Sequence, residues 1–85
     1  MISIVVVYNN KRILNDILLK SLKKQTAKFE LIALDNTKGK FKSAAEALNQ
    51  GGKNANGKYI MFVHQDIELD SDLWLKEVEK FLAIS

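Results

Sequence analysis

The 85-residue sequence contains no cysteine and no proline, and its four glycines all lie between Gly39 and Gly57. The absence of cysteine excludes a disulfide framework and a thiolate metal site. No apolar run approaches the roughly 20 residues that a membrane span requires. The apolar N-terminal run also lacks the basic start and the cleavage pattern of a signal peptide. These absences predict a soluble domain, and we expect a cytoplasmic location.

Arginine is scarce as well, because Arg12 is the only one and the lysines are spread along the chain. Proteins that bind nucleic acid usually gather Lys and Arg on one face. The net charge of +3 therefore indicates a solvated lysine surface that mildly favours anionic ligands, and we expect no nucleic-acid partner. With 47% hydrophobic and 27% charged residues, the composition is typical of a single small domain covering residues 1–85.

Apolar periodicity predicts three strands that alternate with three helices. The predicted strands cover residues 2–8, 29–35 and 59–64, and the predicted helices cover residues 11–24, 43–52 and 70–83. Ser43 and Glu46 have the spacing of a capping box, and we expect their helix to end near Gly51. In the last helix we expect four residues on the inner face, Trp74, Val78, Phe81 and Leu82.

This β-α-β-α-β-α pattern predicts an α/β fold with right-handed crossovers, a parallel three-stranded sheet and three layers, as in Rossmann-like domains. Ligands of such sheets bind beyond the carboxyl ends of the strands. Polar residues follow each predicted strand at that end: Tyr8 and Asn9, then Asp35 and Asn36, then His64, Gln65 and Asp66. We therefore expect these three groups to converge on one rim.

Each candidate also has a plain structural explanation. Asp35 and Asn36 are residue types that commonly start turns. Tyr8 could pack beneath a loop, and His64 could be a hydrogen-bonded core residue. Lys42 belongs to a lysine-rich loop that could simply be solvated. It is the joint placement of the candidates that favours a binding site.

His64 and Asp66 form the candidate metal pair. They are two residues apart, so in an extended segment their side chains would point the same way and share one divalent ion. Two ligands are too few for a closed structural site, but they suit an ion whose remaining positions hold water and phosphate oxygens. We expect Mn²⁺ or Mg²⁺, since a nitrogen ligand shifts the preference towards Mn²⁺.

Four segments, in this order, resemble the N-terminal half of a family 2 glycosyltransferase with the GT-A fold. They are "SIVVVYNN", "SLKKQT", "FELIALDN" and "ALNQGGKNANGKYIMFVHQD". The last segment leads into the position of the family's Asp-x-Asp motif. Here that position reads His64-Gln65-Asp66, and a bacterial subgroup of glycosyltransferase-like proteins is similar in carrying His-Gln-Asp. The swap removes one negative charge beside the metal.

The resemblance implies a role for each candidate. Tyr8 would lie against the nucleobase, Asp35 would accept a hydrogen bond from it, and Lys42 would sit near the base or the diphosphate. The residues expected to bind the nucleotide are Tyr8, Asn9, Asp35, Asn36, Lys42 and Gln65, and those expected to bind the metal are His64 and Asp66. The metal would stabilise the departing nucleoside diphosphate as a Lewis acid.

The expected function is therefore binding of a nucleotide-sugar donor, with UDP-sugar expected by family habit, and metal-assisted glycosyl transfer in the full-length protein. No residue matches the position of the family's catalytic base, so we expect this part of a GT-A domain to be inactive alone. The alternatives are a non-catalytic module that binds a nucleotide or a partner, and an unrelated flavodoxin-like or receiver-like domain. We expect strand order 3-2-1, with strand one at an edge and a homodimer formed through it.

Overall fold

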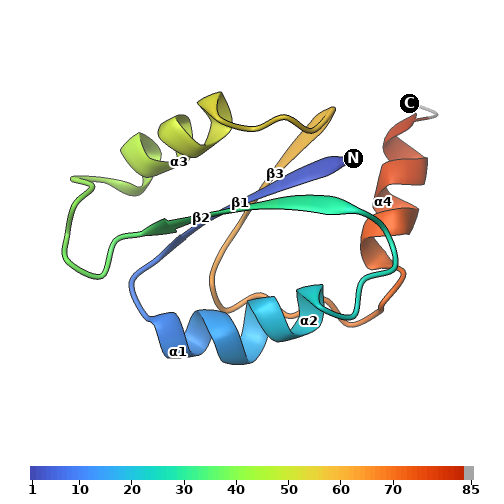
Figure 1. The fold of residues 1–85 in the computed structure, drawn as a ribbon, viewed down its shortest axis with the longest axis horizontal. Coiled ribbons are helices and arrows are strands. Elements are labelled where there is room, and N and C mark those ends of the chain that lie inside the picture. The colour runs from blue at the N-terminus through green and yellow to red at the C-terminus, as the bar shows by residue number, and fades with distance from the viewer. Residues whose placement is uncertain (84–85) are drawn as a thin grey trace.

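The computed structural model describes residues 1–83, which form a three-stranded parallel sheet with helices on both faces (Figure 1). The strands are β1 (Ile2–Tyr8), β2 (Phe29–Asp35) and β3 (Tyr59–Val63). The first helical segment is continuous and comprises α1 (Lys11–Ile13), the π-helix η1 (Leu14–Leu19) and α2 (Lys20–Leu22). The remaining helices are α3 (Ala44–Lys53) and α4 (Trp74–Ala83). The predicted alternation of strands and helices and the parallel sheet are confirmed.

The strand order is β2-β1-β3, so the predicted order 3-2-1 is wrong. β1 lies in the middle and pairs along its whole length with β2 on one side and over Ile2–Val6 with β3 on the other. Its residues Ile2–Val6 are buried on both faces, whereas side-chain exposure alternates along β3. The strand with the longest β-branched run therefore takes the most buried position, as expected for the centre of a parallel sheet. Because both edges of β1 are hydrogen-bonded, dimerisation through strand one is also wrong.

The main core lies between the sheet and the first helical segment. Ile2, Ile4 and Val6 of β1 point to this side and pack against Leu14 and Leu18. α4 lies near the amino-terminal end of the sheet (Figure 1). Its contribution to the core comes from three residues near its start, Trp74, Leu75 and Val78.

The expected inner face of the last helix is only partly confirmed. Phe81 and Leu82 are 67% and 37% exposed, whereas Leu75 is 1% exposed. α4 begins at Trp74, later than predicted, and its first two turns are the ones that reach the core. Trp74 and Val78 therefore pack on the core as expected, whereas the end of the helix carries its apolar side chains away from it.

α3 packs closely on the other face of the sheet. Its N-cap is Ser43, whose Oγ accepts a hydrogen bond from Glu46 N at 3.1 Å, so the predicted helix start is confirmed. The helix runs through Gly51 and Gly52 to Lys53 instead of ending at the glycines. A Cβ at Gly51 would collide with the side chain of Val5. This glycine therefore permits close contact between helix and sheet instead of forming a C-cap.

The amino-terminal end of the sheet is closed by a hydrogen-bond network. Ser3 Oγ donates to Glu30 Oε1 at 2.7 Å and accepts from Gly57 N at 2.7 Å. Asn56 donates to both carboxylate oxygens of Glu30 at 2.9 Å, through its backbone N and its Nδ2. These bonds to Asn56, followed by that from Ser3, lower the pKa of Glu30. They attach the loop before β3 to β1 and β2.

The segment "SLKKQT" ties the first helical segment to the start of α4. Ser21 Oγ donates to Leu18 O at 2.9 Å and accepts from Leu69 N at 3.2 Å. Gln25 donates through Nε2 to Ser71 O at 2.7 Å and accepts through Oε1 from Leu75 N at 3.0 Å. The Ser and Gln of this segment therefore have structural roles. None of the helices within residues 1–83 has the length and apolar character of a membrane span.

Candidate functional site

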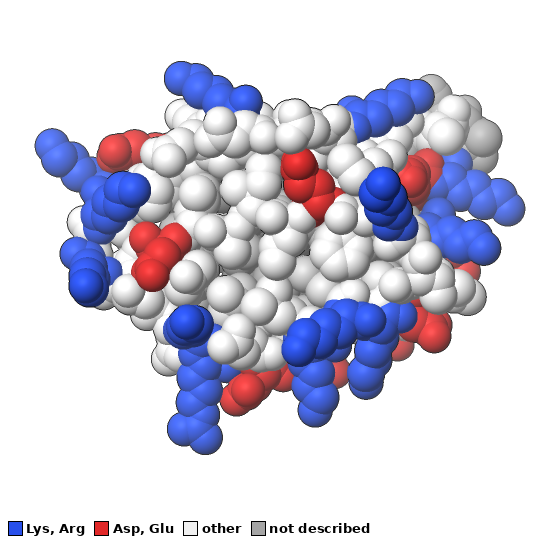
Figure 2. Space-filling view, viewed as in Figure 1, with Lys and Arg blue, Asp and Glu red and all other residues white. Residues whose placement is uncertain are grey.

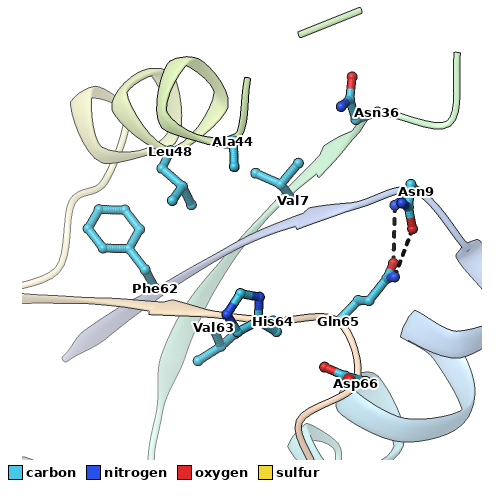
Figure 3. Close-up of a pocket in the computed structure, with 10 residues that line it drawn as sticks. All are labelled: Val7, Asn9, Asn36, Ala44, Leu48, Phe62, Val63, His64, Gln65 and Asp66. Carbon is cyan, nitrogen blue, oxygen red and sulfur yellow. Dashed lines mark hydrogen bonds between the residues drawn. The ribbon is translucent and has the colours of Figure 1, made fainter. Parts of the chain in front are cut away.

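A cavity of about 450 Å³ opens at the carboxyl ends of β1 and β3, beside the start of α3 (Figure 3). It is lined by Val7, Asn9, Asn36, Ala44, Leu48, Phe62, Val63, His64, Gln65 and Asp66. The strand order explains its position. After β1 the chain forms β2 on one side of it, and later it forms β3 on the other side. The direction in which strands are added therefore reverses between β1 and β3. Ligands of open α/β sheets bind at such a switch point.

Gln65 joins the carboxyl ends of the two strands. Its Oε1 accepts hydrogen bonds from the backbone N–H groups of Asn9 and Asn10, each at 3.1 Å. Its Nε2 donates to Asn9 Oδ1 at 2.8 Å (Figure 3). Asn10 is itself the N-cap of α1 and accepts from Ile13 N at 3.1 Å. Gln65 therefore positions the cavity rim and the start of the first helical segment, which the sequence did not indicate.

His64 and Asp66 flank Gln65 on a turn and not on an extended segment. Ile67 N donates to His64 O at 3.3 Å, which closes the turn directly after β3. The expectation that both side chains project the same way from a strand is therefore wrong. His64 still projects to the same side of β3 as Phe62, and Asp66 lies on the turn that follows (Figure 3). Within residues 1–83, neither side chain makes a hydrogen bond or an ion pair, so both are available to a ligand.

The fit of a metal ion rests on this pair. Among the described residues 1–83, no group of three or more His, Cys, Asp or Glu side chains is arranged to hold an ion. His64 and Asp66 offer one nitrogen and one carboxylate donor at the same cavity. This donor set suits only an ion that keeps most of its positions for water or ligand oxygens.

Tyr8 and Asp35 lie together on the opposite face of the sheet from the cavity. They are register partners at the ends of β1 and β2. Successive side chains of a strand point to opposite faces, so Val7 lines the cavity while Tyr8 packs against the main core. The pKa of Tyr8 is raised mainly by burial and, to a smaller extent, by the nearby Asp35 carboxylate. Two hydrogen bonds from Thr37, at 2.7 and 2.8 Å, lower the pKa of Asp35.

Two further candidates lie in the loop between β2 and α3. Asn36 lines the cavity, and its Oδ1 accepts from Phe41 N at 2.8 Å, which holds the loop closed. Lys42 is not among the residues that line the cavity, and its backbone N donates to Glu46 Oε2 at 3.2 Å. A second hollow of about 400 Å³ lies beside Asp35 at the outer side of β2, with Lys38 and Lys40 among its lining residues.

The structure thus brings five of the eight predicted site residues to one cavity: Asn9, Asn36, His64, Gln65 and Asp66. It also adds an apolar wall that includes Val7, Leu48 and Phe62, which sequence reasoning assigned to strands and a helix alone. A signal for one of them was present. Phe62 is two residues before His64, so within the predicted strand 59–64 the two share a face.

Charge is spread around the molecule, as the lysine distribution in the sequence indicates. In Figure 2, Lys and Arg side chains stand mostly towards the margin of the face shown, and acidic side chains lie both between them and within the face. A scan of protein-family models, a search of curated proteins and a search of solved structures each find no match to this chain.

Proposed function

We propose that the cavity between β1, β3 and α3 binds a nucleotide-sugar, with a UDP-sugar as the expected donor, and that the chain is the donor-binding part of a GT-A glycosyltransferase domain. The observation that carries the proposal is the convergence of Asn9, Asn36, His64 and Asp66 on one cavity at the switch point of the sheet. The family resemblance of the ordered segments supports the same function. The cavity volume of about 450 Å³ is in the range of small-molecule sites.

The two kinds of lining suggest how the donor would lie. Phe62 is 52% exposed and offers a ring on which a nucleobase or sugar could stack. Phe62 takes the stacking role in this proposal because Tyr8 faces the other side of the sheet. The Asn9 and Asn36 side chains lie on the polar rim, where they could bond to hydroxyl or carbonyl groups of the donor.

His64 and Asp66 would hold Mn²⁺ or Mg²⁺ at the diphosphate end of the donor. When bound, such an ion supplies Lewis-acid stabilisation of negative charge on the diphosphate. The residues of this chain bind and orient the donor in this scheme, and no residue is assigned as a catalytic base.

A second candidate function is binding of a nucleotide at the same cavity without transfer. The observation that favours it is the small metal donor set, with an imidazole beside a single carboxylate. Hydrolysis of UDP-sugar by the protein with Mn²⁺ would favour the enzyme, whereas tight UDP binding without hydrolysis or transfer would favour the binding module.

The proposal is tested by calorimetric titration with UDP in the presence and absence of Mg²⁺ or Mn²⁺. We expect binding that the metal strengthens and that Asp66→Asn makes independent of metal. Asp70→Asn is the matched control, because it makes the same change of charge on an exposed residue that does not line the cavity. An equal loss of the metal effect on UDP binding in both variants would contradict the proposal. No binding at millimolar UDP with either metal would also contradict it.

A further inference from the structure

The outer edge of β3 is an unpaired, uncharged strand edge. Within residues 1–83, β3 pairs with β1 alone, so its other edge presents backbone groups that no strand satisfies. On the α3 side of the sheet, Ile60 and Phe62 are 44% and 52% exposed. α3 packs on the central strand, where a Cβ at Gly51 would collide with Val5, and it reaches this edge strand at the Phe62 ring beside Gly52, so both side chains stay partly exposed. An edge of this kind is a template for another strand.

The other edge strand, β2, is protected against such pairing. It contains Glu30 near its start and Asp35 at its end, and charges on an edge discourage pairing with another chain. Glu30 is also held by Ser3 and Asn56, so it cannot move aside without breaking that network. β3 reads Tyr-Ile-Met-Phe-Val and contains no charged residue. The two edges therefore differ in the property that controls association.

We propose that two copies of this chain associate through β3, antiparallel and centred on Met61, to form a continuous six-stranded sheet. In this register all five residues of β3 pair. Tyr59 of each copy faces Val63 of the other, and Ile60 of each copy faces Phe62 of the other. The second pair joins a β-branched and an aromatic side chain on one face, a combination that stabilises antiparallel pairs. The register thus places the two large exposed side chains of the strand side by side on the α3 face of the sheet.

The charges around β3 favour the antiparallel direction and a second copy as the occupant. Lys58 directly precedes the strand, whereas Asp66 lies on the turn that follows it. Antiparallel pairing brings the basic start of one copy beside the acidic end of the other, and parallel pairing would bring like charges together. The strand and its flanking charges are therefore complementary to themselves in one direction only.

The association is tested by sedimentation equilibrium of the 85-residue chain and two variants. We expect the mass to rise with concentration from 9.6 kDa to twice that value. Ile60→Lys should raise the dissociation constant of the dimer by about tenfold or more. Leu31→Lys is the matched control, because Leu31 is 37% exposed on the other edge strand. A monomer at millimolar concentration, or equal weakening by both substitutions, would overturn the proposal.

The register is tested by cross-linking, because the chain has no cysteine of its own. Directly opposed residues of antiparallel strands lie within the range of Cα separations that a disulfide spans. We therefore expect an equimolar mixture of Ile60→Cys and Phe62→Cys to form the mixed disulfide dimer faster than either variant forms its own. Homodimers that form as fast as the mixed dimer would overturn this register.

Discussion

The two ends of the three-stranded sheet are built in different ways. At the amino-terminal end, Ser3, Glu30 and Asn56 bond to one another and hold the loop before β3 in place. At the carboxyl end, polar side chains form one part of the lining of a cavity whose other part is apolar. There His64 and Asp66 bond to nothing within residues 1–83. The difference indicates that one end stabilises the fold while the other end is free to bind.

The physical reason lies in where each polar group finds its partner. A polar group that is bonded inside the protein contributes to the native state, and removing its partner leaves that group unsatisfied. An exposed group without a protein partner is hydrated in the folded and unfolded states alike, so its loss costs little stability. Gln65 and Asn36 are exceptions at the carboxyl end, since the Gln65 amide is bonded to Asn9 and Asn10 and Asn36 Oδ1 accepts from Phe41 N. The following predictions test this division, from the largest expected effect to the smallest.

Gly57→Ala should cause the largest loss of stability. A Cβ at this position would lie 2.5 Å from Ser3 Oγ, 2.7 Å from Ser3 N and 2.8 Å from Met1 O. Two of these atoms belong to the backbone, so the loop must shift and the Ser3 network must break. Overpacking of this kind typically costs 1–3 kcal/mol, and we expect a loss of about 2 kcal/mol in urea unfolding.

Gly52→Ala is the matched control for this substitution. A Cβ at Gly52 would meet only the ring of Phe62 at an ordinary contact distance of 3.6 Å. Because Ala is favoured over Gly inside a helix, we expect a gain of about 0.5–1 kcal/mol. Equal losses at Gly57 and Gly52 would show that the amino-terminal network is not what makes Gly57 sensitive.

Gln65→Ala should cause the largest loss of stability at the carboxyl end. The substitution removes an acceptor for the N–H groups of Asn9 and Asn10 and a donor to Asn9 Oδ1. Since water can replace part of these bonds at an exposed site, we expect a loss of about 1 kcal/mol in the free energy of unfolding. A loss below the error of the measurement would contradict the positioning role assigned to Gln65.

Glu30 should make stability depend on pH. Asn56 and then Ser3 lower the pKa of Glu30 in the folded state. A lowered folded pKa gives stability that is present above the unfolded pKa and is lost as the pH falls through the folded pKa. Stability should therefore fall from about pH 5 downwards, and Glu30→Gln should flatten this part of the profile. The pH dependence of stability is measured by thermal unfolding. A profile that is the same in Glu30→Gln as in the unsubstituted chain would contradict the role assigned to the network.

His64→Ala and Asp66→Asn should have the smallest effect on stability and a large effect on binding. Both residues are exposed and line the cavity. Surface substitutions without a partner usually change stability by less than about 0.5 kcal/mol, and we expect that here by urea unfolding. Each should nevertheless abolish the metal dependence of UDP binding. A marked loss of stability would mean that the carboxyl end of the sheet also stabilises the fold through these two residues.

Local patterns predicted the elements because each was encoded within a few residues. The alternation of strands and helices, the cap at Ser43 and the polar residues at the strand ends all follow from neighbouring sequence. The strand order does not follow from neighbouring sequence, because it depends on which strand gains the most free energy from burial of its apolar side chains. The unbroken run of β1, buried on both faces, was the available clue that it lies in the centre.

The candidate site was predictable in position and less so in detail. The carboxyl-end rule brought Asn9, His64 and Asp66 to the correct rim. The turn closed by Ile67 N and His64 O was missed, because a strand was extended one residue too far. Tyr8 was assigned to the rim. It is separated from Ile4 and Val6 by even numbers of residues in the same strand, and this spacing places it on the core face with them.

A two-dimensional NMR titration of the folded chain with UDP and Mg²⁺ would show which end of the sheet binds the nucleotide. We expect chemical-shift changes at Asn9, Asn36 and residues 64–66, strengthened by the metal, with Ser3 and Gly57 at the opposite end of the sheet unaffected. Shifts centred on the amino-terminal end, or none at millimolar UDP with the metal present, would contradict this expectation.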